Sequence, residues 1–265
     1  MLISSKTNPK YKYLLQLSSA HKHKQSMFLI EGFREVSRAL KAGINLEYMI
    51  FNQTSFQLPS VKENFGEFTE NHRCLVFPNN LFKKLSLRDN PDGIMGIAQK
   101  WSPKFLRSNL KKDGLYLLVE GIEKPGNLGA LMRSAEATAV DGFFIANPVV
   151  DIFNPNVIRA SQGAVFNLNI YWDSSENLLN LLKTTSLQLL ATTPHAQQMY
   201  WDCDMRKGSV ICIGSEAYGL SHLWLQQATP ITIPMYGQSA DSLNAGVSGT
   251  LCLYEAQRQR RTTSC

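Results

Sequence analysis

The sequence has little of what membrane-spanning, secreted or disulfide-bonded proteins need. None of its apolar runs approaches the ~20 residues that a transmembrane helix requires, and its basic N-terminus lacks the apolar region of a secretory signal. Its five cysteines occur without the Cys-x-x-Cys spacing of zinc clusters and without the density of a disulfide framework. We therefore expect a cytoplasmic protein with reduced thiols and no membrane anchor.

Several common functional motifs are missing as well. The five histidines show no ligand-like pairing with Cys or Glu, so we expect no metal. The chain lacks the Gly-x-x-x-x-Gly-Lys-Ser/Thr phosphate loop and the Gly-x-Gly-x-x-Gly dinucleotide turn. It also lacks the Gly-x-Ser-x-Gly elbow of serine hydrolases. These absences argue against nucleotide hydrolysis, dinucleotide chemistry and hydrolysis at an activated serine.

Charge is distributed unevenly along the chain. Residues 1–112 contain 18 Lys and Arg against 8 Asp and Glu, whereas residues 113–265 contain 9 against 13. A basic module joined to a mildly acidic one is typical of a polyanion-binding domain attached to a catalytic domain. A merely soluble, lysine-rich surface would give the same counts, and charge alone does not separate these interpretations.

The hydrophobic pattern divides the chain into two α/β parts. In the first hundred residues, helical apolar spacing alternates with strand-like runs at 28–30, 46–51 and 93–98. A polar, basic stretch punctuated by Pro and Gly follows Trp101, as expected of a linker. We predict a first domain over residues 1–104, a linker over 105–113 and a second domain over 114–265.

The second part alternates short, wholly apolar strands with helices. This rhythm predicts a parallel sheet covered on both faces, a doubly wound α/β domain. We expect strands at 115–119, 143–146, 168–171, 188–191, 210–213 and 230–233, and helices at 128–139, 155–161, 176–182, 222–227 and 243–260.

A glycine-rich turn follows the first of these strands. The segment Glu120-Gly-Ile-Glu-Lys-Pro-Gly-Asn-Leu-Gly129 lies at the carboxyl end of a strand, where open α/β sheets bind their ligands. Asn127 and Arg133 could therefore line one rim of a pocket. A helix cap and a surface cation are the alternative interpretation of these two residues.

Three later segments are also candidates for binding a ligand at the end of a strand or the start of a helix. Gly214-Ser-Glu-Ala-Tyr-Gly-Leu-Ser221 leads from a strand into a helix that Ser221 is placed to cap, and its small residues let the backbone approach a ligand. In Ile231-Thr-Ile-Pro-Met235, Pro234 removes an amide donor at the strand end, which leaves apolar side chains and carbonyls for a planar ligand such as adenine. Ser242-Leu-Asn244 begins the last helix and supplies a hydroxyl, an amide and unpaired N–H groups.

Taken in this order with Asn127-x-Gly129-x-x-x-Arg133, these segments resemble the SpoU (TrmH-like) family of RNA 2′-O-methyltransferases in the SPOUT superfamily. Residues 2–98 more weakly resemble the L30e-like RNA-binding domain that precedes many of these enzymes. The resemblance implies a deep trefoil knot over about residues 210–255, an exception to the usual avoidance of knots. It also implies a homodimer, S-adenosylmethionine as cofactor, and RNA as substrate, with ribosomal RNA favoured over transfer RNA.

The resemblance further assigns individual residues. It implies that Arg133 is the catalytic arginine, that Asn127 and Glu216 support it, and that Ser242 and Asn244 lie near the methyl donor. The cofactor would be held largely by backbone groups, at Thr192, Thr193, Gly214, Glu216, Gly219, Ile233, Pro234, Met235, Leu243 and Asn244.

The role of Arg133 follows from the chemistry of guanidinium. Because this group stays protonated in proteins, we favour a role in which Arg133 binds the adjacent phosphate and stabilises the negative charge that develops on the attacking oxygen. A contribution to removing the proton of the hydroxyl is left open. Basic residues of the first domain are candidates for gripping the RNA backbone, with solvated helix faces as the competing explanation. These candidates are Lys6, Lys10, Lys12, Lys22, Lys24, Arg34 and Arg38.

Two other functions remain in view. A catalytically silent protein that keeps the knot for RNA binding in ribosome assembly is the leading alternative, although the retained polar residues argue against it. Base methylation is disfavoured by the Asn-x-Gly-x-x-x-Arg motif.

Overall fold

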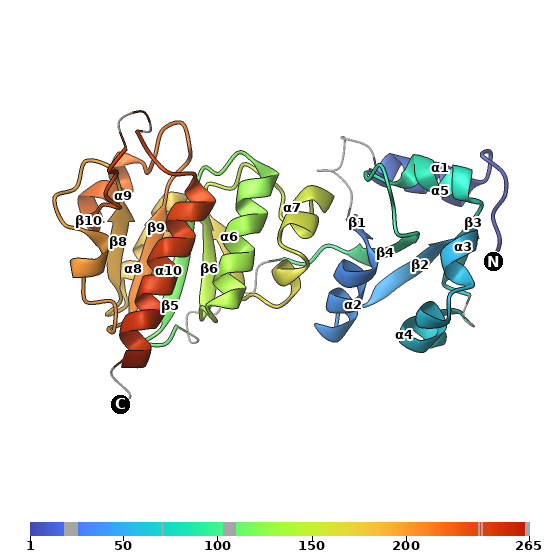
Figure 1. The fold of residues 1–265 in the computed structure, drawn as a ribbon, viewed down its shortest axis with the longest axis horizontal. Helices are drawn as coiled ribbons and strands as arrows, with labels where there is room; N and C mark the ends of the chain where they lie inside the picture. The colour runs from blue at the N-terminus through green and yellow to red at the C-terminus, as the bar shows by residue number, and fades with distance from the viewer. Residues whose placement is uncertain (19–25, 70–71, 103–109, 238, 240, 263–265) are drawn as a thin grey trace. The chain divides into compact units, whose positions relative to one another are not determined.

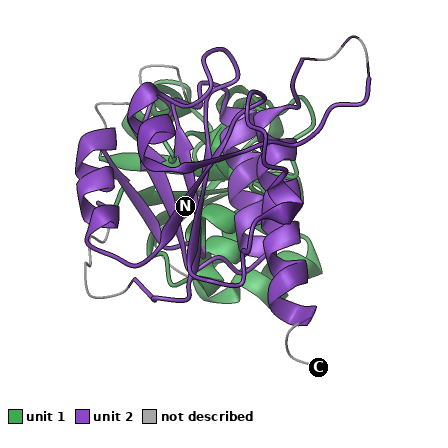
Figure 2. Ribbon diagram, turned by 90° about the vertical axis from the view of Figure 1, so that its left-hand side faces the viewer, with its two compact units in different colours: residues 1–101, 151–166 green, residues 102–150, 167–265 purple. Residues whose placement is uncertain are grey.

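The computed structural model describes residues 1–265 except 19–25, 70–71, 103–109, 238, 240 and 263–265. Its contacts divide the chain into a first unit of residues 1–101 and 151–166 and a second unit of residues 102–150 and 167–265 (Figure 2). The sequence-based domain limits remain a prediction, and residues 105–109 of the predicted linker lie outside the described residues. The grouping of residues 151–166 with the first unit was not anticipated.

Aromatic packing explains why residues 151–166 group with the first unit. The ring centroid of Phe153 lies 4.8 Å from that of Phe28 and 4.5 Å from that of Trp101. Beside these rings, Lys100 Nζ lies 2.7 Å from the carboxylate of Asp151. Burial of several aromatic rings together contributes more than any single polar contact in such a segment.

The first unit is built on a four-stranded sheet of order β1-β4-β2-β3. Strand β4 pairs antiparallel with β1 and β2, while β3 runs parallel to β2. The strands are β1 (Met27–Glu31), β2 (Leu46–Asn52), β3 (Cys74–Phe77) and β4 (Ile94–Gln99), and the helices are α1 (Pro9–Ser18), α2 (Phe33–Lys41), α3 (Gln53–Phe56), α4 (Pro59–Thr69), α5 (Asn79–Leu85) and α7 (Pro155–Ala160), with the short η3 (Ala164–Phe166).

The second unit contains a six-stranded parallel sheet of order β10-β8-β9-β5-β6-β7 (Figure 1). The central strands β5 and β9 are buried along their whole length, which explains their uninterrupted apolar sequences. The strands are β5 (Leu115–Glu120), β6 (Gly142–Ala146), β7 (Ile170–Asp173), β8 (Gln188–Thr192), β9 (Ser209–Ile213) and β10 (Thr229–Ile231), and the helices are α6 (Pro125–Ala137), α8 (Ser175–Lys183), η4 (Tyr200–Asp202), α9 (His222–Gln227) and α10 (Ala245–Thr262).

Helices α6 and α10 lie side by side and run parallel (Figure 1). Ser134 Oγ lies 2.6 Å from Thr250 Oγ1, and a Cβ on Gly249 would come within 2.4 Å of Leu131 Cδ2. Glycine at position 249 therefore lets the two helices approach closely. As a result, the first turns of α6 and α10 meet at the same end of the sheet.

The predicted α/β class and parallel sheet are confirmed, with differences at element ends. Helix α6 begins at Pro125 rather than at residue 128, because proline is well suited to the first helical position. Strand β10 ends at Ile231 and contains Pro230, which an edge strand tolerates. Within the described residues, no helix is long and apolar enough to cross a membrane.

Candidate active site

The carboxyl ends of four neighbouring strands lie at one edge of the second sheet. Val119 of β5 pairs with Ile213 of β9, and Ala191 of β8 pairs with the preceding residue of β9. On the other side of β8, Thr192 pairs with Ile231. The segments after these strands therefore start side by side, at the position where parallel sheets bind ligands.

The segment after β9 is a tight glycine loop. Ser215 and Gly219 exchange two backbone hydrogen bonds of 3.1 and 3.0 Å, and Gly219 has a φ of +68°. A Cβ on Gly214 would lie 2.0 Å from the carbonyl carbon of Gly219. No side chain fits at position 214, so the loop presents backbone groups to a ligand at this edge of the sheet.

Three polar side chains from distant parts of the chain converge beside this loop. The amide of Asn127 donates to the carboxylate of Glu216, and Asn244 Nδ2 donates to Asn127 Oδ1 at 3.1 Å. Asn244 Oδ1 also accepts from the backbone N–H of Gly246 at 2.9 Å, which caps the start of α10. The structure thus joins three of the five predicted catalytic residues through hydrogen bonds.

The other two predicted catalytic residues make no such contact. Arg133 is exposed on α6, six residues beyond Asn127, which corresponds to about 9 Å along the helix and a different side of it. Ser242 is exposed in the segment without regular structure that precedes α10. Among the described residues, neither side chain has a hydrogen-bonding partner within this chain.

The predicted cofactor-binding residues lie along the same sheet edge. Thr192 Oγ1 donates to the carbonyl of Cys212 at 2.9 Å, and the N–H of Thr193 donates to the carbonyl of Ile231 at 2.9 Å. The remaining apolar candidates are half-buried and follow β10 or precede α10: Ile233, Pro234, Met235 and Leu243. This combination of half-buried apolar side chains and irregular backbone suits a planar ligand with hydrogen-bonding edges.

Glu120 is a central residue of this region that the sequence did not reveal. Its buried carboxylate, at the end of β5, accepts four hydrogen bonds of 2.6–3.1 Å. The donors are Ser175 Oγ, the N–H and Oγ of Ser221, and Trp224 Nε1. Ser221 occupies the N-cap position of α9 but makes no side-chain capping bond, because its hydroxyl donates to Glu120. The predicted capping role of Ser221 is therefore wrong.

The candidate RNA-binding residues have varied surroundings in the first unit. Lys6 and Lys12 are exposed, and Lys10 Nζ lies 4.7 Å from the centroid of the Tyr48 ring. Arg34 pairs with Glu35 at 3.0 Å, and Arg38 Nη1 donates to the carbonyl of Gln162 at 2.8 Å, so Arg38 also has a structural partner. Lys22 and Lys24 lie outside the described residues. No group of three or more His, Cys, Asp or Glu side chains suitable for a metal occurs in the part that the structure describes.

Two family profiles match the chain. The SpoU rRNA Methylase family matches residues 114–254, and the MRM3-like substrate binding domain matches residues 8–96. An uncharacterized tRNA/rRNA methyltransferase of Synechocystis sp. is 33% identical over 265 residues, which cover 99% of this chain and 95% of the relative. The 23S rRNA (guanosine(2553)-2′-O)-methyltransferase RlmP of Bacillus subtilis is 26% identical, with 95% of this chain and 97% of the relative covered.

Solved structures share the whole architecture. The crystal structure of an RNA 2′-O ribose methyltransferase has a TM-score of 0.85 and 41% identity, with 98% of this chain and 100% of that chain covered. An AdoMet-bound rRNA methyltransferase from Sinorhizobium meliloti has a TM-score of 0.86 and 26% identity, with 97% of each chain covered.

Proposed function

Because the chain belongs to the SpoU rRNA methylase family, as its motifs predicted, we propose that it transfers a methyl group from S-adenosylmethionine to a ribose 2′-hydroxyl of ribosomal RNA. The observation that carries this proposal is the hydrogen-bonded group of Asn127, Glu216 and Asn244 at the carboxyl edge of the sheet. Relatives that share the fold over nearly the whole chain are RNA 2′-O-methyltransferases by name. The proposal places the protein in the cytoplasm with its RNA.

The second unit offers residues that fit S-adenosylmethionine. The loop over 214–219 brings backbone N–H and carbonyl groups to the sheet edge, because no Cβ fits at Gly214. The half-buried Ile233, Met235 and Leu243 supply apolar contacts for an adenine ring. Thr192, Thr193, Gly219 and Pro234 complete the proposed binding set. When bound, the cofactor supplies an electrophilic methyl group on a sulfonium.

The polar side chains then have positioning roles. Displacement at a methyl carbon requires the ribose oxygen to be aligned with the carbon and sulfur, so orientation supplies much of the rate. Asn127 and Asn244 hold each other and are placed to orient the ribose, while Glu216 anchors Asn127. Ser242 contributes a hydroxyl beside them. Arg133 binds the RNA phosphate and stabilises negative charge that develops on the attacking oxygen.

The first unit recognises the RNA. A profile match to a substrate-binding domain and the excess of basic residues in this part of the chain both support that role. Lys6, Lys10 and Lys12 precede or lie on α1, and Arg34 and Arg38 lie on α2. Contacts of such residues with phosphates give affinity without reading sequence, and they weaken as salt rises.

A homodimer is part of the proposal. Helix α10 carries an exposed apolar stripe at i, i+4 and i+7, formed by Val247, Leu251 and Tyr254, residues that are 48, 37 and 54% exposed. A stripe with this spacing on one helix face suits packing against a second copy of the same helix. We further propose that the segment over about residues 210–255 forms the trefoil knot that the family resemblance implies.

Calorimetric titration with S-adenosylmethionine separates this function from a silent RNA-binding protein. We expect saturable binding that is lost when Gly214 is replaced, followed by methyl transfer to ribosomal RNA that nucleoside digestion and mass analysis locate on the 2′-oxygen. Binding of RNA without uptake of the cofactor would indicate a catalytically silent RNA-binding protein. Methylation of a base rather than of the ribose would indicate a base methyltransferase.

A further inference from the structure

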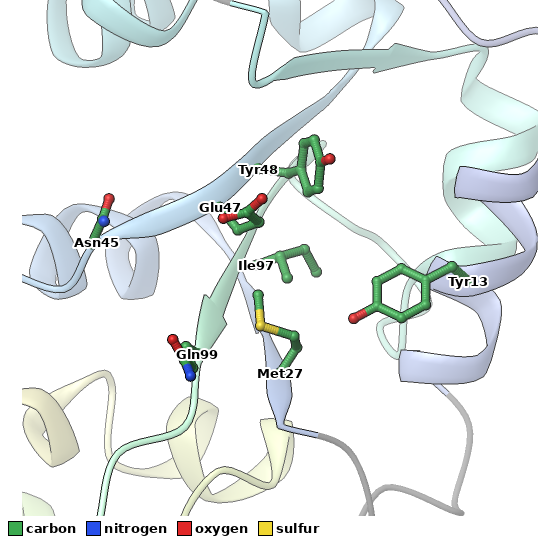
Figure 3. A pocket seen from close by; sticks show the side chains of 7 residues that line it. All are labelled: Tyr13, Met27, Asn45, Glu47, Tyr48, Ile97 and Gln99. Atoms are coloured by element: carbon green, nitrogen blue, oxygen red, sulfur yellow. The ribbon is translucent and has the colours of Figure 1, made fainter.

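The first unit contains a cavity of about 310 Å³ at one end of its sheet (Figure 3). Helix α1 forms one wall, and the starts of β1 and β2 and the end of β4 form the others. Its lining residues are Tyr13, Met27, Asn45, Glu47, Tyr48, Ile97 and Gln99. The volume lies at the lower end of the range for small-molecule pockets, which suits one planar group rather than a long segment of chain.

The inner surface of the cavity is apolar and aromatic. Ile97 is fully buried, and Met27 and Tyr48 pack against the core of the unit while keeping part of their surface open. Figure 3 shows Tyr13 extending from α1 with its hydroxyl directed toward the strands that carry Ile97 and Met27. Two tyrosine rings and a thioether offer the polarizable contacts on which an aromatic base stacks.

The rim of the cavity is polar. Asn45, Glu47 and Gln99 are exposed and supply two amides and one carboxylate. Burial, together with the charge of Glu47, raises the pKa of Tyr13, so its phenol stays neutral and can donate a hydrogen bond. The cavity therefore presents both donors and acceptors around an apolar floor.

Cations stand beside the same cavity. Lys10 Nζ lies over the Tyr48 ring, and Arg73 Nη1 donates to Asn45 Oδ1 at 3.5 Å. The Glu47 carboxylate on the rim and the cations beside it complement a nucleotide, whose base carries N–H donors and whose phosphates are negative.

We propose that this cavity binds one unpaired guanine base of the substrate RNA, as a specificity site separate from the methyl-transfer site. The inference rests on the proposed function and extends it to what the first unit reads. Sequence-specific recognition of RNA uses unstacked bases held against aromatic rings and read along their Watson–Crick edge. On that edge, guanine offers two adjacent N–H donors that match the two oxygens of Glu47. Its O6 can accept from the amide of Gln99.

The other bases fit this set of groups less well. Adenine and cytosine place a ring-nitrogen acceptor on the same edge, which would face the Glu47 carboxylate. Uracil offers a single ring N–H between two carbonyls. Glu47 is therefore the residue that selects the base, while Tyr13 and Tyr48 hold any base by stacking.

The test uses the full-length protein and short oligouridine RNAs that carry one central guanosine, inosine or adenosine, with binding measured by fluorescence anisotropy. Inosine lacks the 2-amino group that would reach Glu47. We expect the guanosine RNA to bind about tenfold more tightly than the other two, the change expected for one lost two-donor contact. In Glu47→Gln we expect the three affinities to converge, whereas Glu63→Gln, an exposed acid on α4, keeps the preference.

Tyr13→Ala serves as a second variant that is easily tolerated, because this side chain is 38% exposed. It should weaken all three RNAs by a similar factor, and S-adenosylmethionine binding should be unchanged in every variant. Equal affinity of the wild-type protein for the three RNAs, with cofactor binding intact, would overturn the guanine site and leave the proposed function standing. Absence of cofactor binding would instead count against the proposed function, whatever the RNA preference.

Discussion

Trp224 Nε1 donates to the carboxylate of Glu120 at 3.1 Å, and both side chains are buried. The same carboxylate holds Ser175 at the start of α8 and Ser221 just before α9. Glu120 thus fastens the end of β5 to two helix starts. Through Ser221 it fixes the far end of the loop that carries Glu216.

Replacing Glu120 should therefore loosen that loop and lower stability. We expect Glu120→Ala to cost about 3 kcal/mol or more in urea unfolding, because it removes the acceptor that Ser221 shares with the buried donors Ser175 Oγ and Trp224 Nε1. Glu120→Gln keeps one acceptor oxygen and should cost less. The matched control is Glu123→Ala, an exposed acid three residues later, whose effect should stay within about 0.5 kcal/mol. Equal effects of Glu120→Ala and Glu123→Ala would show that the hydrogen bonds accepted by Glu120 do not contribute to the free energy of unfolding.

Gly214→Ala should abolish binding of S-adenosylmethionine. The added Cβ would meet backbone atoms of Gly219 and Leu220 at 2.0 and 2.1 Å, so the loop has to open. We expect a loss of about 2 kcal/mol or more in unfolding free energy, as for other forced backbone shifts. Gly126→Ala, where a Cβ would meet nothing within 4 Å, is the control and should retain both stability and cofactor affinity. Calorimetry of both variants provides the measurement.

Arg133→Ala should abolish methyl transfer and leave cofactor affinity nearly intact. The side chain is exposed and outside the hydrogen-bonded group of Asn127, Glu216 and Asn244, so its loss should not disturb the fold. We expect a fall in turnover of at least about 100-fold, as for removal of one transition-state donor. Arg206→Ala, which removes an arginine paired with Asp204 on the surface, is the control. Wild-type turnover in Arg133→Ala would remove this residue from the mechanism.

Charge reversal on the first helix, α1, and in the segment before it should weaken RNA binding in a salt-dependent way. We expect Lys6→Glu with Lys12→Glu to lower affinity for ribosomal RNA and to flatten its dependence on salt, because fewer counterions are released. Lys62→Glu on α4 serves as the control for a generic change in net charge. Filter binding at several salt concentrations gives the slope of log affinity against log salt, and identical slopes for the variant and the parent protein would mean that Lys6 and Lys12 do not contact the RNA backbone.

The buried thiols should be unreactive until the protein unfolds. Burial raises the pKa of Cys252 to about 12 and also raises the pKa of Cys74, Cys203 and Cys212. Unfolded thiols titrate near ~8.5, so the native thiolate fraction of Cys252 at pH 8 is lower by roughly 1,000-fold. In a Cys265→Ser background, we expect a thiol reagent to label the native protein slowly and the denatured protein at once. Fast native labelling would contradict this burial.

The same shift predicts how stability changes with pH. Because folded Cys252 keeps a proton that the unfolded chain releases, its contribution is complete below about pH 8.5 and declines as pH rises toward about 12. We expect Cys252→Ala to show a smaller loss of unfolding free energy between pH 8 and 10 than the parent protein, measured in urea.

Local sequence patterns were enough to predict the parallel sheet, but not the side-chain hydrogen bonds that join distant segments at its edge. Gly214 and Gly219 mark a tight turn after an apolar strand, and such turns are visible in sequence because few residues fit them. The role of Glu120 depends on donors 55 to 104 residues away, and no local pattern encodes such partners. The same limit explains why the packing of Phe153 against Phe28 and Trp101 was not anticipated, since these aromatic partners are distant in sequence.

Asn127 is bonded to side chains that lie 89 and 117 positions later in the chain. During synthesis, every strand of both sheets is therefore made before the last member of this trio leaves the ribosome. A chain that ends between Ile231 and Asn244 would contain every strand of both sheets but would lack Asn244, to which we assign the orientation of the ribose. In our proposal the site is therefore completed only when the start of the last helix joins a sheet that is already formed.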